Sequence, residues 1–192
     1  MGLLIMANEG RYTNLGAVNH TIRYITRTRK NESKRNELIC FGGSGIGSYL
    51  PSEEIIRQIC YVQKVYNINA RQGRRMYHEF FLISPEEFEM MNGNWNYVQS
   101  LAVECCQIYY GMGFQVVYAI HYDPEKKIHI HFCVSTINFY TGRKWHSSKN
   151  DLKRREAIFN GLMQKYQKII VPLKFVNEAK GESDNEKGVC CM

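Results

Sequence analysis

Three histidines in one short stretch are the residues of this chain best suited to carry chemistry. They are His121, His129 and His131, half of the six histidines in the sequence. In an extended strand, successive side chains alternate between the two faces, so His129 and His131 point the same way. Asp123 and Pro124 are turn-forming residues, and a hairpin at that point brings His121 back beside the other two.

Three neutral imidazoles on one face of a sheet can bind a divalent metal and leave coordination positions open, as catalytic metal sites do. The same spacing also fits the polar face of a half-buried sheet, and spacing alone does not decide between the two readings. The flanking segments favour the metal site. Residues 115–120 and 132–137 are β-branched and aromatic runs of strand length, which support ligands rigidly.

The composition describes one globular domain with a basic surface. The chain has 192 residues, is 44% hydrophobic and 22% charged, and carries a net charge of +7, which favours a polyanionic partner. Its seven cysteines include no Cys-x-x-Cys pair, so no zinc ribbon is predicted, and a reducing, cytoplasmic setting fits best. Residues 1–7 are too short for a signal peptide and no run reaches membrane-spanning length, so no membrane insertion is expected.

Helix and strand signals alternate along the chain. Helices are expected at 14–27, at 51–66, from 85 to 110 with a break near 92–94, and within 147–166. Strands are expected at 38–41, 76–83, 115–121, 128–137 and 173–176. The fold class expected is α+β, with a central antiparallel sheet of about five strands and helices largely on one face. Strands 115–121 and 128–137 should be adjacent at its centre.

The histidine segment resembles the third motif of the relaxase/mobilisation nuclease family, part of the His-hydrophobic-His (HUH) superfamily of single-strand endonucleases. That motif is a His-x-Asp, a short turn and a His-x-His, matched here by His121-Tyr-Asp123 and His129-Ile-His131. The Asn-Phe-Tyr-Thr-Gly-Arg-Lys-Trp-His run at 138–146 is similar to the turn that often follows. A Tyr-His with a later Ser-Pro-Glu-Glu precedes the motif at 77–87.

The resemblance covers most of residues 14–176, so a single relaxase-type nuclease domain is expected over 1–180, with a disordered polar tail at 181–192. The family's first motif carries a nucleophilic tyrosine on an early helix, and Arg23-Tyr24-Ile25-Thr26-Arg27 matches it. The resemblance therefore implies Tyr24 as the catalytic residue. His20, one helical turn earlier, would then assist proton transfer or be an ordinary exposed helix residue. The chain departs from the pattern at Ser135, where many members have Asn.

What the resemblance implies is a metal-dependent DNA relaxase that nicks single-stranded DNA at a plasmid or mobile-element transfer origin. Such a site- and strand-specific endonuclease acts as a transesterase, because its tyrosine joins the 5′ phosphate and the break can be religated. The three histidines would bind one divalent ion, Mg²⁺ or Mn²⁺ in use, with Zn²⁺ or Ni²⁺ able to occupy the same site. The implied partners are single-stranded DNA, accessory DNA-binding proteins and a coupling protein.

Further candidates surround this core. Asp123, Glu79 and Ser135 are candidates to orient the metal-bound histidines. Basic residues that could follow the DNA backbone are Arg23, Arg27, Arg71, Arg74 and Arg75. Two alternatives stay open: a non-catalytic single-stranded DNA-binding module of the same fold, and a metal-dependent hydrolase without a tyrosine nucleophile.

Overall fold

The structure is a computed structural model that describes residues 1–7, 12–14, 16–30, 33–47, 50–66, 73–123 and 127–168. The strand expected at 173–176, the tail at 181–192 and the candidate Arg71 lie outside the described residues. In the described part of the chain, no helix is both long enough and apolar enough to cross a membrane.

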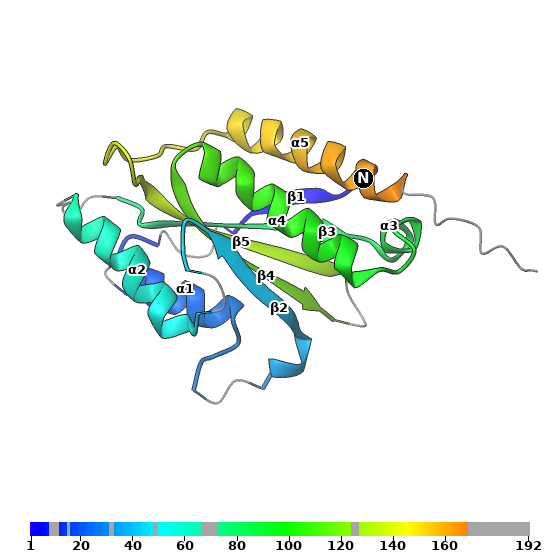
Figure 1. Ribbon diagram of the computed structural model, residues 1–192, viewed down its shortest axis with the longest axis horizontal. Helices are drawn as coiled ribbons and strands as arrows, with labels where there is room; N and C mark the ends of the chain where they lie inside the picture. Colours follow the sequence, from blue (N-terminus) through cyan, green and yellow to red (C-terminus); the bar gives the residue numbers. More distant parts are fainter. Residues whose placement is uncertain are drawn as a thin grey trace, which may run out of the picture.

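A five-stranded sheet forms the centre of the molecule (Figure 1). Its strands are β1 (Leu3–Met6), β2 (Leu38–Ser44), β3 (Met76–Ile83), β4 (Phe114–Tyr122) and β5 (Ile128–Asn138). They are ordered β1-β3-β5-β4-β2, and every neighbouring pair is antiparallel. The α+β class and the antiparallel sheet of five strands are confirmed, and β5 lies at the centre with β4 beside it, as predicted.

One edge strand of the sheet was not among the strands expected from the sequence. The apolar segment Leu3–Met6 forms β1 and pairs with β3, with Leu4 opposite Phe81. Gly2 lies directly against the Phe81 ring, where a Cβ atom would have no room. Four apolar residues are enough to form an edge strand.

In the described residues, four α-helices lie between these strands and a fifth follows β5. They are α1 (Ala17–Ile25), α2 (Ser52–Val65), α3 (Pro85–Met90), α4 (Trp95–Gly111) and α5 (Lys149–Gln167), and a short 3-10 helix (Arg35–Glu37) precedes β2. The break predicted near residues 92–94 separates α3 from α4. Ser84 and Glu87 form a capping box that starts α3. Helix α1 is shorter than predicted at its start, because Gly16 occupies the N-cap and supplies no side-chain hydrogen bond.

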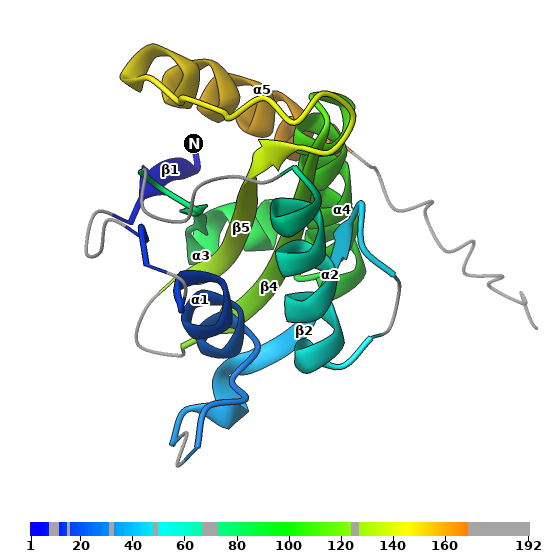
Figure 2. The ribbon, with the colours of Figure 1, turned by 90° about the vertical axis from the view of Figure 1, so that its left-hand side faces the viewer.

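Helices cover both faces of the sheet, so the prediction that they lie largely on one face is wrong. On one side, α1 and α2 pack against the face that carries Val117, Ala119 and Cys133. On the other side, α4 and α5 pack against the alternate residues of the same strands, among them Phe132 and Val134. Figure 2, turned from the view of Figure 1, shows α1 and α2 in front of the sheet.

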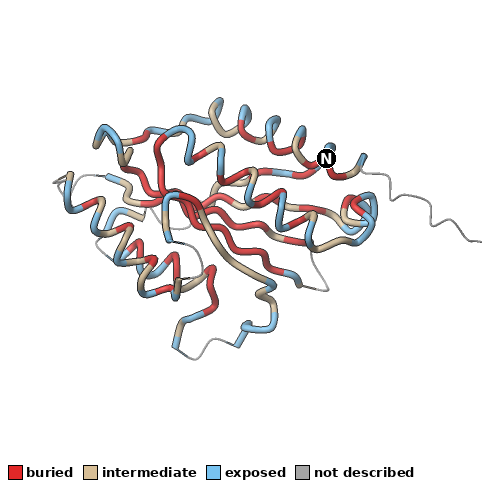
Figure 3. The backbone as a smooth tube through the Cα atoms, in the orientation of Figure 1, coloured by how far each residue is buried: buried red, intermediate tan, exposed pale blue. Residues whose placement is uncertain are grey.

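The physical reason lies in the central strands, which are apolar on both faces. All but one residue of β4 and nine of the eleven residues of β5 are buried. In Figure 3 the central strands are accordingly mostly red. A strand with one solvated face would alternate apolar and polar residues, whereas a continuous apolar run needs cover on both sides. The face beneath α1 and α2 is the one that carries the histidines.

Candidate active site

The β4–β5 hairpin brings the three predicted histidines together on the face covered by α1. His121 on β4 lies directly opposite His129 on β5, and His131 follows two residues later on the same face. The ring centroids of His121 and His131 are 4.4 Å apart, and those of His129 and His131 are 6.0 Å apart. The expected grouping of these side chains is therefore present.

A fourth histidine, His78, joins this group from β3. Its Nε2 lies 2.9 Å from Nδ1 of His131, and its Nδ1 lies 3.2 Å from the hydroxyl of Tyr12. The sequence analysis gave neither residue a role. The signal for His78 was its position in a strand of otherwise apolar and aromatic residues, but its partner became evident only from the pairing of β3 with β5.

Burial keeps the central histidines neutral. Removal from water lowers the pKa of His78 to about 4, and the neighbouring His121 acts in the same direction. Burial likewise lowers the pKa of His121 to about 4 and that of His131 well below its usual value. Neutral imidazole is the form that binds a metal ion, so these three rings are in a ligating state at neutral pH.

The end of α1 holds the His121 ring on both sides. Nε2 of His121 donates to the carbonyl oxygen of Ile25 at 2.6 Å, and Nδ1 accepts from Arg27 Nη2 at 3.2 Å. Arg27 is itself buried and paired with Glu37 at 2.6 Å. Within the described residues, no three His, Cys, Asp or Glu side chains are arranged as a ready-made metal cluster. Both ring nitrogens of His121 are engaged. Ligation through Nδ1 would displace the bond from Arg27, and ligation through Nε2 would require the ring to give up both bonds.

Tyr24 points from α1 toward the histidines. Its ring makes edge-on contacts with His78 and His131, at centroid distances of 5.9 and 6.0 Å. The guanidinium groups of Arg29 and Arg27 lie 4.6 and 5.1 Å from the centre of the same ring. A phenol between imidazoles and two cations is well placed to act on an anionic group, because both guanidinium groups attract that anion.

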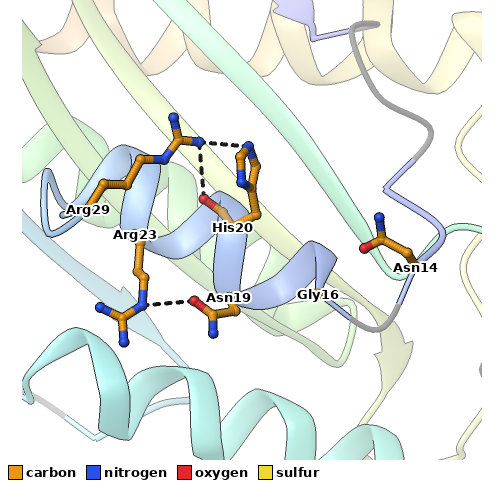
Figure 4. Close-up of a pocket in the computed structure, with 6 residues that line it drawn as sticks. All are labelled: Asn14, Gly16, Asn19, His20, Arg23 and Arg29. Atoms are coloured by element: carbon orange, nitrogen blue, oxygen red, sulfur yellow. Dashed lines mark hydrogen bonds between the residues drawn. The ribbon is translucent and has the colours of Figure 1, made fainter. Parts of the chain in front are cut away.

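His20, the possible proton acceptor for Tyr24, has a different partner. Its Nε2 lies 2.8 Å from Arg29 Nη2, which also reaches the His20 carbonyl oxygen (Figure 4). Partial burial, and then the charge of Arg29, lower the pKa of His20. The structure thus connects His20 to the arginine that lies over the Tyr24 ring.

These side chains border a cavity of about 840 Å³ between α1 and the sheet. Its polar walls include Tyr24, His78, His129 and His131. A second hollow of about 600 Å³ adjoins it, since Asn14, His20 and Arg29 line both. Figure 4 shows this second hollow along the outer side of α1, with Arg23 bonded to Asn19. Together, the two hollows extend from the histidines to the basic outer side of α1.

Two of the three candidates for orienting the histidines lie away from them. Glu79 follows His78 on β3 and therefore faces the opposite side of the sheet. There it is fully buried and bonds to Tyr109 at 2.7 Å and to Arg155 at 2.5 Å. Ser135 shares the histidine face but lies four residues, or about 13 Å, beyond His131.

Asp123, the third candidate, lies one residue beyond the end of β4. The hydrogen bond to Glu37 raises the pKa of Lys34, and the charge of Asp123 adds to that shift. The pKa of Glu37 is lowered, because Lys34 and Arg27 outweigh burial and the opposing charge of Asp123. Asp123 is therefore near the Glu37 carboxylate that pairs with Arg27. This places it beside the Arg27 and Glu37 ion pair at the rim of the site.

The candidate DNA-binding arginines divide into two groups. Arg23 lies on α1 at the second hollow and pairs with Glu53 at 3.0 Å. Arg74 and Arg75 precede β3, whose first residue lies opposite Ser135, so they are at the far end of this face from the histidines. Arg29 is not among the arginines expected from the sequence to bind DNA, yet its guanidinium group lies closer to the Tyr24 ring than that of Arg27.

Comparison with known proteins agrees with this geometry. A family model described as "Relaxase: MobA/VirD2-like, nuclease domain" matches residues 24–168. The match includes Tyr24, the three clustered histidines and all strands except β1. A search of curated proteins finds no match. Since the family model spans well over half of the sequence, the chain belongs to the relaxase family.

Proposed function

We propose that this protein is a metal-dependent relaxase that nicks single-stranded DNA through Tyr24. Membership of the relaxase family supports a DNA nickase in general. The observation that carries the more specific proposal is the placement of Tyr24 in one cavity with His129 and His131. A nucleophile and its catalytic cluster must share a site, and here they come from segments about 100 residues apart in the sequence.

The reaction follows from the chemistry of the phenol. The Tyr24 oxygen attacks the phosphorus of a backbone phosphodiester and loses its proton, and the bond from phosphorus to the 3′ oxygen breaks. The 3′ oxygen takes up a proton and leaves as a hydroxyl, while the 5′ phosphate stays joined to Tyr24. Because one phosphate ester replaces another, attack by the 3′ hydroxyl reverses the step and religates the strand.

Arg29 and Arg27 assist the nucleophile in this proposal. The phosphodiester is an anion and gains further charge in the transition state, so cations beside Tyr24 would favour its approach to the phenol oxygen. The two guanidinium groups lie within 4.6 and 5.1 Å of the Tyr24 ring centre. They also offset the negative charge of an approaching phosphate.

The histidines fit a divalent cation in donor type and protonation state. His121, His129 and His131 would hold Mg²⁺ or Mn²⁺, with Zn²⁺ or Ni²⁺ able to occupy the same site. Uncharged ligands leave the ion's charge intact, and the bound ion would polarise the phosphate oxygens and stabilise the added negative charge of the transition state. Buried neutral imidazoles support this assignment. To bind the ion, His121 would give up its bond from Arg27 at Nδ1, or both that bond and the one to Ile25 if it binds through Nε2.

The proposed substrate is single-stranded DNA at a transfer origin, cut at one site on one strand. An extended single strand could follow the two adjoining hollows past Arg29 to Tyr24. Recognition of the origin would involve accessory DNA-binding proteins, and a coupling protein would receive the complex.

The decisive experiment measures a covalent protein–DNA adduct. The protein is incubated with labelled single-stranded origin DNA and Mn²⁺, and the adduct is resolved on a denaturing gel. Tyr24→Phe should reduce the adduct at least about 1,000-fold, because the phenyl ring has no nucleophilic oxygen. Tyr61→Phe is the matched control, since Tyr61 is 68% exposed on α2 and should leave the adduct unchanged.

Three other outcomes would contradict the proposal. An adduct that persists in Tyr24→Phe, or maps by peptide sequencing to Tyr12, would show that another tyrosine is the nucleophile. Cleavage without any adduct would indicate a metal-dependent hydrolase. Binding of single-stranded DNA with no cleavage in Mn²⁺ or Mg²⁺ would indicate a non-catalytic DNA-binding module of the same fold.

A further inference from the structure

His78 is a buried polar residue that the proposed reaction does not use. It is only 4% exposed and lies between His131 and Tyr12. A buried imidazole without hydrogen bonds would be costly, and here both ring nitrogens have partners. His78 therefore connects a proposed metal ligand to the segment that precedes α1.

The chain of contacts allows only two arrangements of protons. His78 Nε2 and His131 Nδ1 lie 2.9 Å apart, and a single proton is shared between them, so one nitrogen donates and the other accepts. If His78 donates, the proton of His131 sits on Nε2 and that nitrogen cannot bind a metal. If His131 donates, its Nε2 carries a lone pair that can do so.

We propose that His78 is a positioning residue whose Nε2 accepts the Nδ1 proton of His131, holding His131 as the tautomer that can bind a metal through Nε2. The inference rests on the proposed function, in which His131 is a metal ligand. A metal-bound histidine usually donates its second nitrogen to a carboxylate, carbonyl oxygen or water, and such partners fix the ring and its tautomer. Here an imidazole takes that place.

Tyr12 fixes the other end of this series of hydrogen bonds, which runs from His131 through His78. When His78 accepts at Nε2, its own proton is on Nδ1 and is donated to the Tyr12 oxygen, 3.2 Å away. The opposite arrangement has the Tyr12 hydroxyl donating to Nδ1, which would leave His131 in the unsuitable tautomer. Tyr12 thus acts through His78, and its oxygen accepts a hydrogen bond in the competent state.

A neutral partner suits this site electrostatically. Glu79, the nearest residue in sequence with a carboxylate, faces the other side of the sheet, where Arg155 neutralises it. A carboxylate beside His131 would add negative charge where an anionic phosphate must bind, and that would weaken substrate binding. An imidazole fixes the ring without adding charge.

The first test compares Mn²⁺ affinity by titration calorimetry. His78→Leu should weaken Mn²⁺ binding about 10- to 100-fold, the usual effect of losing an outer partner of a ligand. The affinity of His78→Gln for Mn²⁺ should stay within about 3-fold of that of the unmodified protein, because the carboxamide oxygen can accept a hydrogen bond from His131 Nδ1. The exposed His146→Leu is the matched control and should not change the affinity.

The second test needs no metal and no substitution. Long-range proton–nitrogen NMR spectra of the metal-free protein at pH 7.5 report the tautomer of each histidine. His131 and His78 should both carry the proton on Nδ1. A proton on Nε2 of His131 would overturn the proposal, as would equal loss of Mn²⁺ affinity in His78→Leu and His78→Gln.

The two tests separate this proposal from the proposed function. If the unmodified protein does not bind Mn²⁺, or if His131→Ala binds it equally well, the metal site is wrong while the NMR result still decides the tautomer. If His131→Ala loses Mn²⁺ but His78→Leu does not, the metal site stands and the positioning role of His78 is overturned.

Discussion

At the scale of single residues, the site consists of side chains whose surroundings set their protonation. His129 and His131 could be placed on one face from their spacing, because strand alternation is a local rule. The partnership of His78 with His131 could not, since it depends on which strands pair and in which register. The same holds for Tyr12, whose neighbour in space is 66 positions away in the sequence.

The buried histidines predict a pH dependence of stability in the presence of a chelator. The pKa of His78 is about 4 when folded and near 6.5 when unfolded, so between these values the unfolded chain binds more protons. Stability should therefore fall as the pH drops from about 7 toward 4. His78 alone contributes on the order of 2 kcal/mol of that loss by pH 5.

Urea unfolding at pH 7.5, 6 and 5 would measure this loss, with His78→Leu as the comparison. The variant lacks one titrating group and should lose less stability over the same interval. A pH dependence identical to that of the unmodified protein would mean that His78 is not held neutral by the fold. Chelation matters, because a bound cation would oppose protonation of its ligands.

At the scale of elements, local signals located most helices and strands, but not the way the layers stack. The bounds of β3 and the break between α3 and α4 followed from strand-forming residues, a Ser cap and an Asn-Gly turn. The continuous apolar runs in β4 and β5 nevertheless indicate that helices cover both faces of the sheet. Edge strand β1 was missed because four residues carry too little periodicity to identify a strand.

The ion pair of Glu79 and Arg155 connects β3 to α5 on the face opposite the histidines. Arg155→Met should destabilise the protein by about 3–5 kcal/mol, because it leaves a fully buried carboxylate without its cation. The double variant Glu79→Gln with Arg155→Met should be less destabilised than Arg155→Met alone, since no unpaired charge remains. Urea denaturation of the three proteins measures both effects.

The single variant Glu79→Gln tests whether Glu79 influences the metal site. The folded Glu79→Gln variant should bind Mn²⁺ as the unmodified protein does, because the carboxylate lies on the other side of the sheet from His131. Loss of Mn²⁺ affinity comparable to that of His131→Ala would contradict this placement and restore Glu79 as a residue that orients the histidines.

At the scale of the whole molecule, the position of α1 places positively charged residues beside the proposed nucleophile, Tyr24. The chain carries a net charge of +7, and α1 and the turn after it place Arg23 and Arg29 at the hollows beside Tyr24. Basic residues at the mouth of a groove raise the local concentration of a polyanion. A strand entering past Arg29 would pass over the Tyr24 ring before it reached the histidines.

Arg29 should therefore contribute to the salt dependence of DNA binding. In the Tyr24→Phe background, which prevents cleavage, Arg29→Gln should weaken binding of a single-stranded oligonucleotide. It should also reduce the slope of log affinity against log salt concentration by about 0.7, the value for one lost phosphate contact on a single strand.

Arg154→Gln is the matched control for Arg29→Gln. Arg154 is exposed on α5, which covers the opposite face of the sheet, and its replacement should leave the slope unchanged. Fluorescence anisotropy between about 50 and 200 mM NaCl covers the range in which phosphate contacts dominate affinity. Equal slopes for the two variants would mean that the strand does not pass Arg29, and that the basic side of α1 is not the route by which DNA reaches Tyr24.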